Sequence, residues 1–228
     1  MTGAAPHGLD VDRHEFLALL SLGEVDGLRQ RGRQRHWPRG ATLFTEGAPS
    51  DVVIIVLSGR VKVYSLTEAG AEVVLAVRGS GSLLGDLAAI DGRPRSASVT
   101  ALEPVDALVL TAAAFTEYLE STPRVTLVLL RMLTGRLRDA DRKRVEFGAH
   151  DTLGRVARRL VELAERFGER APDGVRITVP FTQDELAGWV GSSREAVTKA
   201  LSRLRTRGYI HTQRRTITVR DMEALRRF

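Results

Sequence analysis

Two short helical patterns, separated by a single glycine and followed by a basic hairpin, restrict the fold of this chain more than any other feature. They occupy residues 182–219. Thr182 and Glu185 have the spacing of a capping box, in which each side chain binds the free backbone N–H of the other residue at a helix start. Apolar residues follow at helical spacing, and Gly191 ends the first helix. The segment therefore predicts two helices joined by a tight turn.

The second of these helices has one apolar face and one polar face. Ser192 or Ser193 caps its start. The apolar positions are Ala196, Val197, Ala200, Leu201 and Leu204. The opposite face carries long hydrogen-bonding side chains, namely Arg194, Glu195, Thr198, Lys199 and Arg203. Because a helix that reads the DNA major groove needs one buried face and one such polar face, we interpret the segment as a recognition helix.

The positive charge of the chain is concentrated in its last third. Residues 148–228 contain 16 Lys and Arg against 10 Asp and Glu, whereas residues 1–147 contain 18 of each. Concentrated positive charge supplies the salt-sensitive, sequence-independent part of DNA affinity. The alternative is an ordinary surface helix with solvated charges. The capped helix in front of it, Arg214 and Arg215 in the hairpin behind it, and the uneven charge together favour a helix-turn-helix followed by a wing.

The composition excludes several other functions. The chain has 228 residues, enough for two domain cores, and no cysteine, so it has no disulfide, thiolate nucleophile or cysteine-ligated cluster. Its five histidines lack the spacing of metal ligands. No apolar run is long enough to span a membrane, and the N-terminus lacks the apolar core of a signal peptide. We therefore expect a cytoplasmic protein that is not an enzyme and has no catalytic residues, no metal and no membrane association.

Residues 38–112 predict a domain built from strands. Short runs that alternate apolar and polar residues are separated by turns that contain glycine. Many short strands at regular spacing favour a sandwich or a barrel-like roll over a parallel sheet.

Between two of these strands, residues 82–99 carry groups that suit a phosphate. A helical turn that starts at Gly85 has free N–H groups that can face an anion. Arg95 offers a two-pronged guanidinium, Ser96 adds a hydroxyl, and Asp86 is an acceptor suited to a ribose hydroxyl. From these residues alone, an ordinary surface loop is the alternative interpretation.

The sequence GDLAAIDGRPRSA in this segment matches the pattern G-E-L-A-x-x-x-x-x-P-R-S/T-A of cyclic-nucleotide-binding domains. With GATLFTEGAPSD, LSGRVKVY and VGSSREAVTKAL, it makes the chain from about residue 16 resemble the family of the catabolite activator (cAMP receptor) protein and the fumarate–nitrate reduction regulator. The resemblance implies an α+β protein with a jelly-roll-like sensor domain over residues 1–122, a dimerisation helix and hinge over residues 123–150, and a winged helix-turn-helix over residues 151–228. It implies ligand contacts from Gly85, Asp86, Leu87, Arg95, Ser96 and Ala97.

Residues 123–147 form one long helical pattern that begins at Pro123, a residue suited to a first turn. Alternating steps of three and four residues define a heptad seam of Leu130, Leu133, Leu137, Ala140, Arg144 and Phe147. The alternative is a seam that packs only on the chain's own β-roll. In the family this helix pairs with its copy, which implies a homodimer.

The resemblance leaves the effector open. In the family's cAMP-binding members, a Thr followed by a Ser or Asn contacts the purine, and these positions fall on Ala140 and Asp141. The Thr is missing, and Asp86 is one methylene shorter than the family's Glu. Arg95 and Ser96, which contact the phosphate, are retained. We therefore expect a phosphate-bearing or anionic effector, with cAMP or another cyclic nucleotide as one possibility, and no tightly bound cofactor.

The resemblance also implies how DNA is contacted. Arg194, Glu195 and Lys199 match the three base-contacting positions, and Lys199 replaces an Arg, which implies a TGTGA…TCACA-like palindrome with relaxed discrimination at one guanine. Phosphate contacts are expected from Thr182, Ser192, Arg214 and Arg215. Ser193, Thr198 and Arg203 complete the expected interface.

We thus expect a homodimeric transcription regulator whose DNA affinity is controlled by a small ligand, with RNA polymerase as a further partner. One alternative is a regulator that is active without ligand because its ligand cassette, residues 82–99, is vestigial. An alternative of another class is the regulatory subunit of an enzyme or channel, which leaves the winged helix unexplained.

Overall fold

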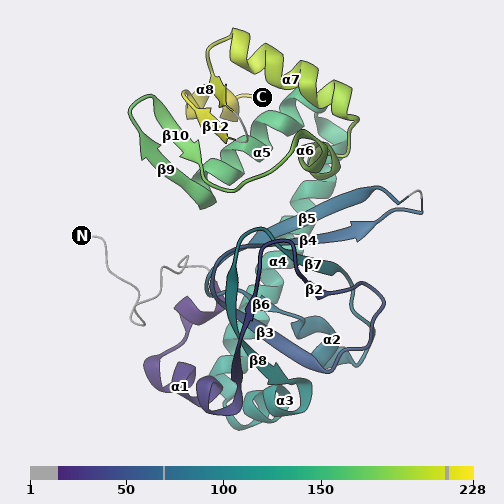
Figure 1. Cartoon of the computed structure of the whole chain (residues 1–228), viewed down its shortest axis with the longest axis vertical. Helices are drawn as coiled ribbons and strands as arrows, with labels where there is room; N and C mark the ends of the chain where they lie inside the picture. The colour runs from purple at the N-terminus through teal and green to yellow at the C-terminus, as the bar shows by residue number, and fades with distance from the viewer. Residues whose placement is uncertain (1–14, 69, 214–215) are drawn as a thin grey trace. The chain divides into compact units, whose positions relative to one another are not determined.

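The computed structural model describes residues 15–68, 70–213 and 216–228. They form two compact units. The first unit comprises residues up to 65 together with 75–138, and the second comprises residues 66–74 and 139–228. The chain therefore leaves the first unit twice, once at the tip of a hairpin and once within a long helix (Figure 1).

The first unit contains the expected β-roll. Its strands are β1 (Arg33–Trp37), β2 (Thr42–Phe44), β3 (Val52–Ser58), β4 (Val61–Leu66), β5 (Glu72–Arg78), β6 (Leu83–Leu84), β7 (Ser98–Ala101) and β8 (Val105–Thr111). They make two four-stranded sheets with the orders β1-β8-β3-β6 and β2-β7-β4-β5. The prediction of a roll rather than a parallel sheet is confirmed, and every strand pair with a defined register in this unit is antiparallel.

Strand β3 is buried on both faces, which explains its almost continuous apolar sequence. Successive side chains of a strand point to opposite faces of the sheet. Val53 and Ile55 belong to a core cluster that includes Phe115, whereas Ile54 and Val56 belong to a second cluster with residues of both sheets. One strand therefore stabilises both layers of the unit.

Helical segments cover the outer side of the first cluster. They are a 3-10 turn at Phe16–Leu19, α1 (Leu22–Arg31), α2 (Asp86–Asp91), α3 (Ala112–Ser121) and the start of α4 (Pro123–Ala149). Phe16 and Phe115 are fully buried there. Helix α1 begins with a capping box of Ser21 and Glu24, and α3 is capped by Thr111.

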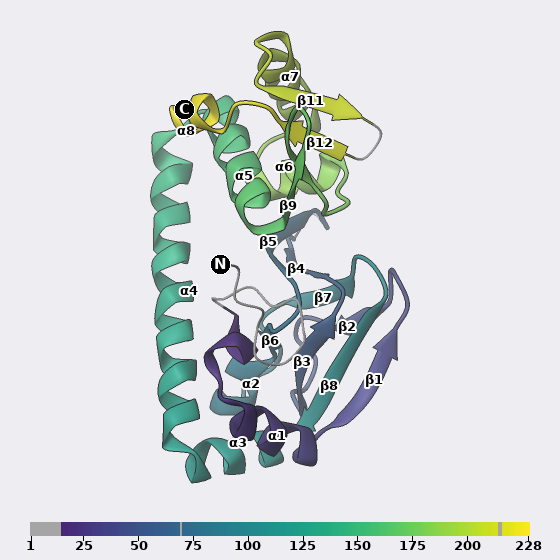
Figure 2. The same ribbon diagram turned by 90° about the vertical axis from the view of Figure 1, so that its left-hand side faces the viewer.

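Helix α4 runs without interruption from Pro123, as expected, and extends to Ala149 (Figure 2). Val125, Val128 and Leu129 pack into the first unit. Of the expected seam, Leu130, Leu137, Ala140, Arg144 and Phe147 are exposed, and Leu133 is partly buried. The first turns of the helix are thus packed on the roll, while an apolar stripe farther along is not.

Besides residues 66–74 and the end of α4, the second unit contains a winged helix-turn-helix, as the sequence predicts. Its elements are α5 (Thr152–Phe167), β9 (Gly168–Ala171), β10 (Gly174–Ile177), α6 (Gln183–Val190), α7 (Arg194–Thr206), β11 (Ile210–Gln213), β12 (Thr216–Val219) and α8 (Met222–Arg226). The strands form one sheet with the order β11-β12-β10-β9. Leu160, Leu163, Leu186 and Leu204 lie in its buried core.

Helix α5 begins with a side-chain cap. Asp151 is the N-cap of α5, and its Oδ1 accepts a hydrogen bond of 2.9 Å from the backbone N–H of Gly154. A Cβ at Gly154 would lie 3.2 Å from both the His150 Cβ and the backbone oxygen of Phe228. The absence of a side chain therefore permits close packing there. Within the described residues, no helix is both long enough and apolar enough to cross a membrane.

Candidate nucleic-acid interface and ligand pocket

The capping box that opens the helix pair forms as predicted. The backbone N–H of Glu185 donates to Thr182 Oγ1 at 3.1 Å, and the backbone N–H of Thr182 donates to Glu185 Oε2 at 2.8 Å. Gly191 ends α6 with φ of 58°. A Cβ at Gly191 would lie 2.4 Å from Phe147 Cε1, so both the backbone conformation and the packing require glycine.

The structure decides between the two serines that follow. Ser193 is the N-cap of α7, and its Oγ accepts from the backbone N–H of Ala196 at 3.2 Å. The Oγ of Ser192 lies 2.6 Å from Thr152 Oγ1 and accepts from Arg155 Nη2 at 3.2 Å. The side chain of Ser192 therefore joins the turn to the start of α5, and its contact with a DNA phosphate stays a prediction.

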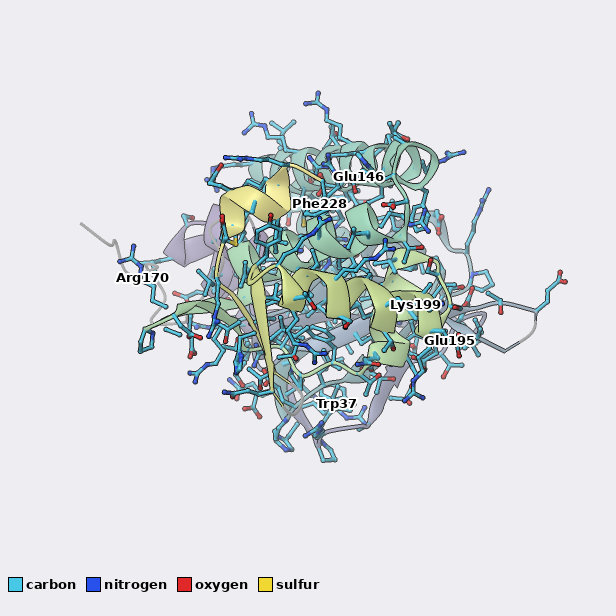
Figure 3. The ribbon with its side chains drawn as sticks, turned by 90° about the horizontal axis from the view of Figure 1, so that it is seen from above. Trp37, Glu146, Arg170, Glu195, Lys199 and Phe228 are labelled. Carbon is cyan, nitrogen blue, oxygen red and sulfur yellow. The ribbon has the colours of Figure 1, made fainter. Side chains whose placement is uncertain are left out.

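The apolar face of α7 is buried and its polar face is exposed. Val197, Ala200, Leu201 and Leu204 pack inward. Arg194, Glu195, Thr198, Lys199 and Arg203 are exposed, and Figure 3 shows Glu195 and Lys199 on this helix. Exposure of the long side chains on one helical face is the arrangement that groove recognition needs.

Two of these exposed residues lie at the N-terminus of α7. The Arg194 side chain is 63% exposed, and its Nη1 lies 3.4 Å from Asp184 Oδ2 of α6. The backbone N–H of Glu195 and the hydroxyl of Ser193 lower the pKa of the Glu195 carboxyl. The carboxylate is therefore charged at neutral pH, and in that state it only accepts hydrogen bonds.

Thr198 has a structural role that its position in the sequence did not indicate. Its Oγ1 lies 2.8 Å from both the backbone oxygen of Arg194 and Gln183 Oε1, so it links α7 to α6. The wing forms between β11 and β12, which pair from Ile210↔Val219 to Gln213↔Thr216. Arg214 and Arg215, expected to contact phosphates, lie outside the described residues.

A cavity of about 240 Å³ in the first unit brings together all six residues predicted for the ligand cassette. They are Gly85, Asp86, Leu87, Arg95, Ser96 and Ala97. Three Arg and one Asp line the cavity, an excess of two positive charges. Ala140 and Asp141 are exposed on α4 and do not line it. Their contact with a purine stays a prediction.

Arg95 is built into the wall of this cavity. It is 5% exposed, its Nη2 donates to the backbone oxygen of Val52 at 2.6 Å, and its Nη1 donates to that of Gly85 at 3.3 Å. The guanidinium carbon lies 3.8 Å from the centre of the Phe44 ring. Burial lowers the pKa of Arg95. A Cβ at Gly85 would lie 2.3 Å from Arg95 Nη1, so this glycine makes room for the guanidinium.

Sequence reasoning missed two basic residues of the cavity, Arg78 and Arg136, of which Arg136 lies on α4. Its Nη1 donates to Asp86 Oδ2 at 3.0 Å, and its Nη2 donates to the backbone oxygen of Leu83 at 2.9 Å. Asp86 is only 3% exposed, and its carboxylate is already paired with the guanidinium of Arg136. The available signal was a basic residue one helical turn before Ala140. A contact of Asp86 with a ribose hydroxyl stays a prediction.

Comparison with known proteins finds a family match for each of the two domains. Residues 34–122 match the cyclic nucleotide-binding domain family, and residues 154–228 match the Crp-like helix-turn-helix domain family. A CRP-like cAMP-activated global transcriptional regulator of Mycobacterium tuberculosis is 36% identical over 191 residues, which cover 84% of this chain and 85% of that protein. A global nitrogen regulator of Synechocystis is 32% identical over 82% of this chain and 84% of that protein.

The fold also matches solved structures. The c-di-GMP responsive global regulator CLP of Xanthomonas campestris superposes with a TM-score of 0.79 at 22% identity, over 88% of this chain and all of that chain. A transcriptional regulator from Thermus thermophilus superposes with a TM-score of 0.71 at 26% identity, over 85% of this chain and 95% of that chain. Both superpositions therefore match the fold of this chain.

Proposed function

We propose that this chain, which belongs to the Crp family of DNA-binding transcription regulators, acts as a homodimer on a TGTGA…TCACA-like palindrome under the control of a small phosphate-bearing ligand. The observation that carries the proposal is the exposed face of α7, with a buried apolar face behind it and a separate cationic cavity in the β-roll. The helix face proposed to contact DNA and the cavity proposed to bind the ligand thus lie on one chain.

The residues of α7 have the chemistry to read bases. Arg194 offers a fork that suits O6 and N7 of guanine, and the charged Glu195 suits the amine of cytosine. Lys199 donates from a single point, so it discriminates less strongly at its base. Thr182, Ser192, Arg214 and Arg215 are proposed to bind phosphates, which position the protein on the duplex. Arg203 suits either kind of contact.

The exposed seam of α4 supports a homodimer. Leu130, Leu137 and Phe147 leave apolar surface uncovered along this helix, and a parallel partner helix with the same heptad pattern buries such a stripe. A two-fold axis then places two recognition helices about 34 Å apart, the distance between successive major grooves. RNA polymerase is the expected protein partner of a regulator bound in this way.

The cavity of the β-roll supports an anionic ligand. Arg95 uses two of its N–H groups on backbone oxygens and retains others, Ser96 adds an exposed hydroxyl, and Arg136 adds a second guanidinium. The relatives do not single out one effector, since one is named cAMP-activated and another c-di-GMP responsive. A cyclic nucleotide is therefore the first ligand to test, and a vestigial cassette is the alternative.

Fluorescence anisotropy with a labelled TGTGA…TCACA duplex tests these proposals. The protein is titrated with and without cAMP, at two salt concentrations, and a scrambled duplex is the control. We expect tighter binding to the palindrome than to the scrambled duplex, with an affinity that falls as salt rises. Equal affinity for both duplexes would contradict base recognition by α7.

The same titration distinguishes a cassette that controls DNA binding through a ligand from a vestigial cassette. Tighter binding with cAMP, lost in Arg95→Gln, identifies a cAMP-gated regulator. Specific binding that neither cAMP nor Arg95→Gln changes identifies a vestigial cassette or a different ligand.

A further inference from the structure

Lysine is rare in this chain, whereas arginine is abundant. Of the 34 Lys and Arg residues, only Lys62, Lys143 and Lys199 are lysines. A guanidinium stays protonated at every physiological pH, whereas the amine of a lysine can lose its proton and act as a nucleophile. Three side chains therefore carry all of the lysine amine chemistry of this sequence.

Two of the three lysines are shielded. Lys62 on β4 is 9% exposed, and its Nζ lies 5.0 Å from the centre of the Tyr64 ring. The side chain of Lys143 on α4 is 27% exposed, and its Nζ lies 3.8 Å from Glu162 Oε1. Burial hinders the approach of a reagent to the first amine, and a carboxylate occupies one side of the second.

Lys199 is exposed on the polar face of α7 (Figure 3). Among the described residues, no carboxylate lies within ion-pair distance of its Nζ. The carboxylate of Glu195, four residues earlier in the helix, accepts hydrogen bonds from its own backbone N–H and from Ser193. Of the three lysine amines, that of Lys199 is therefore the one most open to a reagent.

Arg203 places a guanidinium beside this amine. It follows Lys199 by four residues, so the two side chains are neighbours on the surface of α7. Arg203 is exposed, and no described carboxylate forms an ion pair with it. A guanidinium binds a phosphate through two parallel N–H groups. A reagent that carries a phosphate can therefore be held next to the Nζ of Lys199.

We propose that Lys199 is a modification site, at which an acyl phosphate acylates Nζ while Arg203 binds the phosphate group. The deprotonated amine attacks the carbonyl carbon of the reagent. A C–N bond forms, the C–O bond to the phosphate breaks, and inorganic phosphate leaves with the bonding electron pair. The nitrogen then releases a proton to water and becomes an amide, and no group is oxidised or reduced.

The modification changes the surface that we propose contacts DNA, so this consequence rests on the proposed function. Acylation turns a cation with three N–H donors into a neutral amide with one. Because Lys199 is one of the residues of α7 proposed to contact bases, its acylation is expected to weaken binding to the palindrome by about tenfold, within the range of one base contact.

Mass spectrometry tests the site without DNA. The whole protein is incubated with acetyl phosphate, and the acetyl groups on Lys62, Lys143 and Lys199 are quantified over time by peptide mapping. We expect Lys199 to be acetylated several times faster than either of the other two lysines, because it is the most exposed and has a phosphate-binding neighbour.

Matched variants and a second reagent test the role of Arg203. Acetic anhydride also acetylates amines but has no phosphate. Arg203→Gln is expected to lower the ratio of Lys199 to Lys143 acetylation by about two- to fivefold with acetyl phosphate, the effect of one surface charge, and to leave the ratio unchanged with acetic anhydride. Arg170→Gln removes an exposed charge on β9 and is expected to leave both ratios unchanged.

Fluorescence anisotropy with the labelled palindrome tests the consequence. Protein acetylated at Lys199 is expected to bind about tenfold more weakly than untreated protein. Lys199→Arg cannot be acetylated at this position, so its affinity is expected to be the same before and after treatment with acetyl phosphate. Lys143→Arg is the matched control, and treatment is expected to weaken its DNA binding as much as that of the unsubstituted protein.

Three results would overturn the proposal. One is acetylation of Lys143 as fast as that of Lys199, another is an equal effect of Arg203→Gln with both reagents, and the third is unchanged DNA binding after complete acetylation of Lys199. Failure of the proposed function is distinguished from these results, because the untreated protein would then bind the palindrome and the scrambled duplex equally.

Discussion

Arg95 and Arg194 place the same side chain in opposite surroundings. Arg95 is 5% exposed, donates to two backbone oxygens and covers an aromatic ring. The Arg194 side chain is 63% exposed, with one ion pair at 3.4 Å to Asp184. The first guanidinium is oriented before any ligand arrives, whereas the second is free to change its rotamer on DNA. The β-roll cavity is therefore preorganised, and the face of α7 is adaptable.

The largest expected effect is on stability, where the two arginines should differ most. Arg95→Ala leaves the oxygens of Val52 and Gly85 without their donors and is expected to lower the free energy of unfolding by about 2–4 kcal/mol. Arg194→Ala removes only a surface contact and is expected to change it by less than about 0.5 kcal/mol.

Each unit contains one of the two tryptophans, so urea unfolding can be followed separately in the two units. Trp37 in a Trp189→Phe background reports Arg95→Ala, and Trp189 in a Trp37→Phe background reports Arg194→Ala. Equal losses for the two variants would show that the buried and exposed guanidiniums do not differ energetically.

The next largest effect is on DNA affinity, where substitution of Arg194 is expected to matter more than substitution of Arg95. Arg194 is exposed on the face of α7 that we propose contacts DNA. Arg194→Ala is expected to weaken binding to the palindrome by about 1–3 kcal/mol and to relax the preference at one guanine. Lys199→Arg introduces a guanidinium that can bind a base through two hydrogen bonds, and it is expected to improve discrimination at that base by up to about 1 kcal/mol. Anisotropy titrations with single-base variants of the duplex measure both. An Arg194→Ala loss that is equal on all duplexes would instead indicate a phosphate contact.

The smallest expected effect is a pH dependence at the start of α7. Hydrogen bonds from its own N–H and from Ser193 lower the pKa of Glu195 in the folded state. The stability that this carboxylate contributes is therefore present above the unfolded-state pKa of about 4.3 and is lost as pH falls through the lower folded-state pKa. Glu195→Gln lacks this contribution. Unfolding midpoints between about pH 3 and pH 7 should converge for the two proteins at the acid end; parallel curves would rule out the effect.

Most of the fold and much of the site could be predicted from the sequence, because the signals are local. The capping box of Thr182 and Glu185 and the helix end at Gly191 depend on residues within one turn of each other. The alternation of β3 and the spacing of α7 likewise follow from the periods of strand and helix. The cassette from Gly85 to Ala97 is a continuous segment, so its residues meet in one cavity.

Contacts between distant segments were decided only by the tertiary structure. The pairing of Asp86 with Arg136 joins residues 50 positions apart, and Ser192 turns to Thr152 across 40 positions and leaves Ser193 as the cap. The full exposure of only one of the three lysines likewise depends on how the helices and strands pack. The sequence by itself determined which helices and strands form, because those depend on neighbouring residues. Which buried polar groups find partners depended on how these elements pack, which no local pattern contains.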